Sequence, residues 1–159
     1  MANNFKYETL WQLTQENSSQ LEEIIEEYIK LLSQLTETPM LSKDEFMKNL
    51  FQIKNMGCIY ICYYGSTSEN KICIIGSGTI ILEPKIIRNG KYVGHIEDIV
   101  VDKNFRSMGI SKKIIDKLLL LAKEQNCYKV ILDCKAELCE FYEKNGFETH
   151  GVQMSKYLM

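Results

Sequence analysis

The sequence lacks the features that mark membrane, secreted and nucleic-acid-binding proteins. No apolar run reaches the roughly 18 residues of a membrane-spanning helix, and the N-terminal Met-Ala-Asn-Asn does not begin a signal-peptide core. Basic residues are not in excess, because 19 Lys and Arg stand against 21 Asp and Glu. A general nucleic-acid-binding protein would carry a basic surplus. We therefore expect a cytoplasmic protein that binds neither membrane nor nucleic acid.

Flexible linkers, internal repeats and low-complexity tracts are also missing from the 159 residues. The composition, 45% hydrophobic and 25% charged, is that of an ordinary globular domain. A chain of this length can bury a sizeable core. We predict a single domain over residues 1–159.

Metal-binding and disulfide patterns are weak. No two of the six cysteines form a Cys-x-x-Cys pair, and only His95 and His150 could join them as ligands. Free thiols in a reducing cytoplasm are the favoured interpretation, zinc or a disulfide framework being the alternative, and we expect no metal. The cysteines concerned are Cys58, Cys62, Cys73, Cys127, Cys134 and Cys139.

What the sequence does contain is a clear alternation of strand and helix patterns. A first strand is expected over 5–14, and two capping boxes, Ser19–Glu22 and Ser42–Glu45, each open a helix. Strands at 58–64 and 72–82, joined by a turn at 65–70, read as a hairpin. The remaining predicted elements are a strand at 96–101, a helix from 110, a strand at 129–134, a helix at 136–145 and a strand at 147–154. This order favours an α/β fold with one mixed sheet and helices on both faces.

The loop before the helix at 110 has the character of an anion site. Residues 106–111, Arg-Ser-Met-Gly-Ile-Ser, lead into a helix with a strong 3.6-residue apolar period. The first N–H groups of a helix have no intrahelical acceptor, and the helix dipole places positive charge there. Small residues let a phosphate approach the backbone. We expect a phosphate-bearing cofactor at this position.

The same loop is similar to that of the GNAT superfamily of acetyltransferases, whose pattern is Arg/Gln-x-x-Gly-x-Gly/Ala; Ser111 stands at the last small position. A narrower resemblance, to the GNAT enzymes that act on glucosamine 6-phosphate, lies in four separated blocks. These are Gly94-His-Ile-Glu-Asp-Ile99, Cys127-Tyr-Lys-Val-Ile-Leu-Asp-Cys134, Phe141-Tyr-Glu-Lys-Asn-Gly-Phe147 and Gly151-Val-Gln-Met154.

The resemblance implies a GNAT fold and acetyl-CoA as cosubstrate, lying along a splayed pair of parallel strands at 96–101 and 129–134. The N–H of Ile99 would polarise the thioester carbonyl. Arg106 would steer the phosphates, although a plain surface cation is an equal interpretation. The implied cofactor-binding residues are Ile99, Val100, Val101, Arg106, Ser107, Met108, Gly109, Ile110, Ser111, Tyr142 and Lys144.

The resemblance also implies acetylation of the amine of glucosamine 6-phosphate by direct attack, a step towards UDP-N-acetylglucosamine. Tyr142 would stabilise or protonate the leaving thiolate, or else only pack through its ring. Asp133 would orient the amine, and either Asp133 or water would accept its proton, while Glu97 would bind the amine and sugar. Buried carboxylates need a cationic partner, which is either the protonated amine of the sugar or a structural Lys or Arg. The implied substrate-binding residues are Ser33, Lys85, Arg88, Glu97, Asp98, Tyr128, Lys129, Asp133 and Lys156.

A homodimer with a site shared across its interface is implied as well. The family uses an arginine near the C-terminus, where this chain has Lys156, and either Lys156 or Arg88 would supply the charge. His95 is expected to be a packed, hydrogen-bonded residue rather than a base. Two other functions remain open: a GNAT enzyme for another amine or a protein N-terminus, and a dimeric acyl-CoA-binding module without activity.

Overall fold

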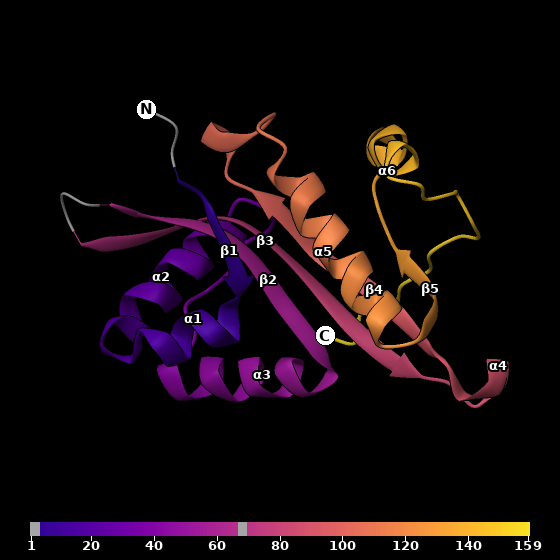
Figure 1. The fold of residues 1–159 in the computed structure, drawn as a ribbon, viewed down its shortest axis with the longest axis horizontal. Coiled ribbons are helices and arrows are strands. Elements are labelled where there is room, and N and C mark those ends of the chain that lie inside the picture. The colour runs from indigo at the N-terminus through magenta and orange to yellow at the C-terminus, as the bar shows by residue number, and fades with distance from the viewer. Residues whose placement is uncertain (1–3, 67–69) are drawn as a thin grey trace.

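A twisted five-stranded sheet runs through the centre of the computed structural model, which describes residues 4–66 and 70–159 (Figure 1). Neighbouring strands in the sheet are also consecutive in sequence. The first three pairs are antiparallel, and β4 and β5 are parallel, so the predicted mixed sheet is confirmed. The strands are β1 (Lys6–Thr9), β2 (Gly57–Ser66), β3 (Lys71–Pro84), β4 (Tyr92–Val101) and β5 (Cys127–Leu132).

Helices cover both faces of the sheet, as the sequence predicts (Figure 1). One face is packed by α1 (Leu10–Glu16), α2 (Leu21–Leu32) and α3 (Lys43–Met56), the other by α5 (Ile110–Glu124). Successive side chains of a strand point to opposite faces. Accordingly Ile61 packs against the first three helices, whereas Cys62 packs beneath α5. Two short helices, α4 (Ile87–Gly90) and α6 (Cys139–Lys144), lie at the ends of β3 and β5.

One of the two predicted capping boxes forms. The Ser42 hydroxyl accepts from the Glu45 N–H at 3.3 Å, and the Ser42 N–H donates to Glu45 Oε2 at 3.2 Å, so α3 begins where predicted. The predicted capping box at Ser19–Glu22 does not form. Ser19 lies inside a 3₁₀ turn at Ser18–Gln20, and α2 begins at Leu21 without a side-chain cap. A capping side chain needs an extended residue before the helix, which the turn does not offer.

Both predicted terminal strands need correction. The first strand ends at Thr9, whose hydroxyl caps α1 by accepting from the Gln12 N–H at 3.1 Å. Leu10 and Leu13 then recur at helical spacing and are buried. Residues 147–159 are described but form neither strand nor helix, so the predicted strand at 147–154 is wrong for this chain by itself. β5 is an edge strand, and this segment has no sheet partner there.

The other predicted elements form with shifted bounds. The hairpin strands are present as β2 and β3, while residues 67–69 of the predicted turn lie outside the described residues. The strand predicted at 129–134 runs from Cys127 to Leu132 instead. The helix predicted at 136–145 is a 3₁₀ turn, Ala136–Leu138, followed by α6. No helix in the described part of the chain has the length and apolar character that membrane crossing requires.

Two irregularities of β4 position the site. Ser77 pairs with Val100 and Thr79 with Glu97, so Asp98 and the following residue oppose a single residue of β3, which is a β-bulge. Asp98 has φ +52°, in the left-handed region. β4 and β5 pair as far as Ile96 and Leu132; β5 ends there, whereas β4 continues to Val101. The two strands therefore form a fork that opens beyond Ile96.

Candidate active site

The loop that enters α5 offers free backbone donors. Ser107 has φ +62° and Gly109 φ +76°, and a side chain on Gly109 would meet nothing within 4 Å. No side chain caps α5, and the first bond back to the loop is from the Lys113 N–H to the Gly109 carbonyl at 3.2 Å. The N–H groups of residues 110–112 precede that bond. A diphosphate fits this arrangement, because those donors converge on open space at the positive end of a helix.

Asp102 and Gln34 hold this loop from two sides. The Asp102 N–H donates to the Ile75 carbonyl at 2.8 Å, and its carboxylate accepts from the Asn104 N–H at 2.8 Å. The side-chain amide of Gln34, just after α2, donates to the other carboxylate oxygen at 2.8 Å and accepts from the Lys103 N–H at 2.9 Å. Sequence reasoning missed Gln34, because it lies 68 positions from Asp102 and nothing in the sequence links them.

A cavity of about 820 Å³ lies between the end of β5, α6 and the residues that follow α6. Tyr142 and Asp133, both predicted as catalytic, line this cavity together with Lys129. Its wall also includes two thiols, Cys134 and Cys139.

Tyr142 is well packed, with 8% of its surface exposed. Its ring lies edge-on to Phe141 and Phe147, with centroids 5.0 and 5.8 Å away. Burial, with a smaller contribution from the nearby Cys134, raises the pKa of the Tyr142 hydroxyl above its ordinary value. The hydroxyl therefore stays protonated at neutral pH and can donate a proton to a developing thiolate.

Three carboxylates gather at the fork between β4 and β5. The pairing between β4 and β5 ends at Ile96 and Leu132. Glu97 follows Ile96, and Asp133 follows Leu132. Burial raises the pKa of Glu97, and the charges of Asp98 and Asp133 raise it further, while His95 lowers it. Carboxylates that repel one another in this way are suited to bind a cation such as an ammonium group.

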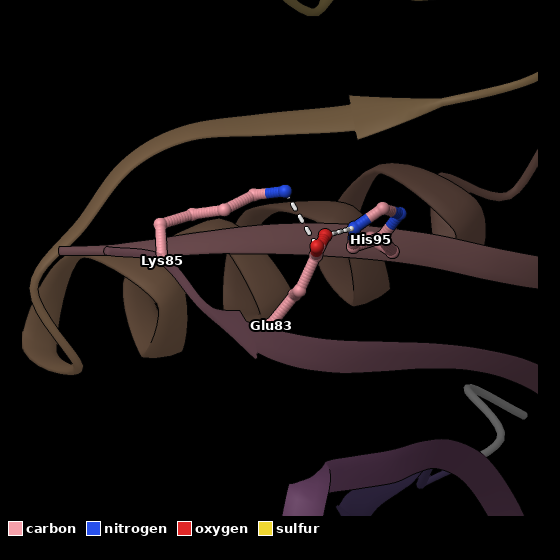
Figure 2. A network of polar contacts seen from close by, with 3 residues as sticks. All are labelled: Glu83, Lys85 and His95. Carbon is pink, nitrogen blue, oxygen red and sulfur yellow. Dashed lines mark hydrogen bonds and ion pairs between the residues drawn. The ribbon is translucent and has the colours of Figure 1, made fainter. Parts of the chain in front are cut away.

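Glu83 joins two residues that the sequence had singled out separately (Figure 2). Its carboxylate lies 2.5 Å from Lys85 Nζ through one oxygen and 2.6 Å from His95 Nε2 through the other. The bonds from Lys85 and His95 lower the pKa of Glu83. His95 is thus a hydrogen-bonded residue, as expected, and Lys85 is held by a carboxylate. Glu83 was missed because its partner His95 lies on the neighbouring strand.

Two further predicted cations meet at one aromatic ring. The Arg88 guanidinium lies 5.6 Å from the centroid of Tyr128, and Lys129 Nζ lies 5.7 Å from it. Arg88 and Asn89 have φ near +57°, being +56° and +58°, in the turn between β3 and β4. The fold therefore brings the two predicted phosphate-side groups together, although they lie about forty positions apart in sequence.

Other predicted residues lie further apart or have other partners. The Ser33 hydroxyl donates to the Ile29 carbonyl at 2.9 Å at the end of α2. Arg106 Nε donates to the Val101 carbonyl at 3.5 Å. Lys144 forms an exposed pair with Glu140 at 2.8 Å, one helical turn away. Lys156 lies in the exposed segment 148–159. Among the described residues, no cluster of three or more His, Cys, Asp or Glu side chains is arranged to hold a metal ion.

Comparison with known proteins places these features in context. A sequence model of the "Acetyltransferase (GNAT) family" matches residues 21–147. Glucosamine 6-phosphate N-acetyltransferase of Arabidopsis thaliana is 41% identical over 131 residues, covering 82% of this chain and 87% of that protein. Glucosamine 6-phosphate N-acetyltransferase 1 of Dictyostelium discoideum is 42% identical, covering 82% of each.

Solved structures agree with the sequence relatives. The crystal structure of the Arabidopsis thaliana enzyme superposes with a TM-score of 0.81 at 34% identity, covering 98% of this chain and 99% of that one. An acetyltransferase of Trypanosoma brucei superposes with a TM-score of 0.79 at 33% identity, covering 98% and 100%.

Proposed function

The chain belongs to the GNAT acetyltransferase family, and on that basis we propose that it transfers the acetyl group of acetyl-CoA to the amine of D-glucosamine 6-phosphate. The product is N-acetyl-D-glucosamine 6-phosphate, an intermediate towards UDP-N-acetylglucosamine. One observation carries the proposal: an uncapped helix start lies beside a fork whose mouth holds three carboxylates. The helix start suits a diphosphate and the carboxylates suit an ammonium group. Relatives that are 38–42% identical to the chain are named glucosamine 6-phosphate N-acetyltransferases.

Acetyl-CoA supplies the acetyl group as a thioester, which an uncharged amine can attack directly. In the proposed complex the N–H groups of residues 110–112 bind the diphosphate. β4 continues past its last pair with β5, so its edge beyond Ile96 is available to the pantetheine arm. The N–H of Ile99 donates to the thioester oxygen as negative charge develops there.

The carboxylates and Tyr142 move the protons. Glu97 and Asp98 hold the incoming ammonium group, and Asp133 orients it and accepts the proton that must leave before attack. The nitrogen then bonds to the acetyl carbon as the carbon–sulfur bond breaks, and it releases its second proton to solvent as the amide forms. The Tyr142 hydroxyl, protonated at neutral pH, gives its proton to the departing sulfur and takes a proton back from solvent.

The phosphate of the sugar is assigned to the cations around the β3–β4 turn. Arg88 and Lys129 share the ring of Tyr128. Lys85 is directed by Glu83, which offsets part of its charge and fixes its position. Arg88 can offer a bidentate fork to a phosphate, whereas the lysines act as point charges.

The exposed C-terminal segment, residues 148–159, is assigned to the contact with a second copy of the chain. Val152 and Met154 are each 91% exposed, and Tyr157 and Leu158 are nearly as exposed. An apolar segment of this kind is expected to be covered by a partner. In the proposed homodimer it pairs with the other subunit and brings Lys156 to that subunit's sugar phosphate. The cytoplasmic location stays a prediction, supported by six free thiols.

Turnover with matched substrates tests the proposal. Thiol release from acetyl-CoA is measured with glucosamine 6-phosphate and with unphosphorylated glucosamine. We expect rapid release with the phosphorylated sugar and slow release without the phosphate. Equal rates, or no release with either sugar, would refute the substrate assignment. Unchanged turnover in both Tyr142→Phe and Asp133→Asn would refute the assigned proton transfers.

A further inference from the structure

Two thiols lie side by side at the wall of the candidate active site. Cys134 Sγ and Cys139 Sγ are 3.9 Å apart, which is close to contact for two sulfur atoms. Both line the same cavity as Asp133 and Tyr142. Cys134 directly follows Asp133, and Cys139 is the first residue of α6, three positions before Tyr142.

The sulfur atoms of the pair already lie within reach of a disulfide. A disulfide holds its sulfurs about 2.05 Å apart, so the two atoms need to approach by only about 1.9 Å. The segment between them is short, with a 3₁₀ turn at Ala136–Leu138 that can adjust at the surface. Cys134 is exposed and so can be reached by a solvent oxidant, whereas the other four cysteines lie on strands β2, β3 and β5.

We propose that Cys134 and Cys139 form a reversible disulfide when the protein meets a peroxide, and that this bond lowers the acetyl transfer proposed above. The Cys134 thiol, whose pKa is raised by burial and by the neighbouring Cys139, first loses its proton. The thiolate attacks one peroxide oxygen and breaks the O–O bond, and the released hydroxide takes up that proton as the first water, leaving a sulfenic acid. The Cys139 sulfur then attacks the Cys134 sulfur and displaces the second water. Two thiols are thereby oxidised by two electrons, one hydrogen peroxide is reduced to two waters, and a dithiol reductant reverses the change.

The link to activity is geometric and rests on the proposed function. The bond would draw the end of β5 towards the first turn of α6, and these two segments carry Asp133 and Tyr142. A misplacement of about 1 Å in a catalytic arrangement can cost about 10²-fold in rate. We therefore expect the oxidised protein to lose at least about tenfold in kcat.

Thiol counting tests the bond separately from the activity. The purified protein is treated with hydrogen peroxide, quenched with an alkylating reagent and weighed intact, and the crosslinked peptide is sequenced. Wild type and the control Cys58→Ser should each lose two alkylatable thiols and show the 134–139 link. Cys134→Ser and Cys139→Ser should show no such link. Turnover of wild type should fall on oxidation and return with dithiothreitol, while Cys134→Ser, which lacks the thiol that attacks peroxide, should keep its own rate under peroxide.

The outcomes separate the two proposals. Six alkylatable thiols in the oxidised wild type, or a link between other cysteines, would overturn the dithiol site. A 134–139 link with unchanged turnover would overturn its effect on activity. A 134–139 link in a protein that never releases thiol from acetyl-CoA would support the dithiol site and refute the proposed function alone.

Discussion

Gln34→Glu is the sharpest test of how the loop that enters α5 is held in place. The substitution keeps the shape of the side chain and the oxygen that accepts from the Lys103 N–H. It replaces the amide that donates to Asp102 with a carboxylate oxygen. Two carboxylates then face each other where a charge-assisted hydrogen bond existed, and the loop before α5 keeps only one of its two hydrogen bonds to position 34.

The cost can be bounded from the geometry. A hydrogen bond to a charged group contributes about 1.5–3 kcal/mol. Two charges at the observed 2.8 Å would repel by about 6 kcal/mol at an effective dielectric of about 20, which is an upper limit. Both side chains are partly exposed, so they can rotate apart and be screened by solvent. We expect a net cost to the ordered loop of about 2 kcal/mol, or about thirtyfold in affinity.

Steady-state kinetics measures this cost, because the substitution should change KM for acetyl-CoA and leave kcat nearly unchanged. Gln34 touches none of the proposed reacting groups, so KM for acetyl-CoA should rise by about ten- to fiftyfold while kcat changes by less than about threefold. Lowering the pH should partly restore KM, because the two facing carboxylates hold a shared proton more tightly than either would alone.

Gln12→Glu is the matched control. Gln12 Nε2 lies 2.9 Å from Glu16 Oε1 on the exposed side of α1, so the same chemical change again sets two carboxylates against each other. This contact is away from the cofactor loop, and KM should stay within about twofold of wild type. A folded Gln34→Glu protein whose KM for acetyl-CoA matches that of the control would refute the role given to Gln34.

Three further results are expected. Ser42→Ala should lower the free energy of unfolding by about 1 kcal/mol in urea, because it removes the cap on α3; an unchanged midpoint would contradict this. Gly78→Ala should lower the melting temperature, because its new Cβ would lie 2.5 Å from Ile99 Cδ1, and such overpacking costs about 1–3 kcal/mol; Gly65→Ala, with nothing within 4 Å, is the control. Because the pKa of Glu97 is raised and its carboxylate is the binding form, the rate should begin to fall at a higher pH than an ordinary glutamate would give. Glu97→Gln should remove this acidic fall from the pH–rate profile. A profile identical to that of wild type would count against the binding role of Glu97.

Local patterns in the sequence predicted much of the fold. The apolar period after residue 110 placed α5 within a residue of its start, because a buried helix face leaves a regular trace. The Ser42 box succeeded since its two partners lie three residues apart. The Ser19 box has the same letters but is preceded by α1 and a tight turn, which sequence letters alone do not reveal.

Features that depend on distant partners could not be predicted. The contacts of Gln34 with Asp102 and of Glu83 with His95 join separate elements, and no spacing rule connects them. The segment 147–154 has a strand-like composition but lacks a partner strand within this chain, so periodicity suggested a strand that the fold does not form. The site residues themselves came from resemblance, and their roles stay predictions.

The bulge in β4 has a consequence for how this gene can change. Ile96 packs beneath α5, yet Val100, four residues later, packs against α2 on the opposite face. In a regular strand those two residues would share a face, so the extra residue shifts the alternation halfway along the strand. Deleting one codon between positions 97 and 99 would leave Val100 three residues after Ile96, so a regular strand would keep both side chains on their present faces and lose only the bulge. A homologous chain with one residue fewer between these positions should therefore have a regular strand here and keep the apolar residues on both sides of the deletion.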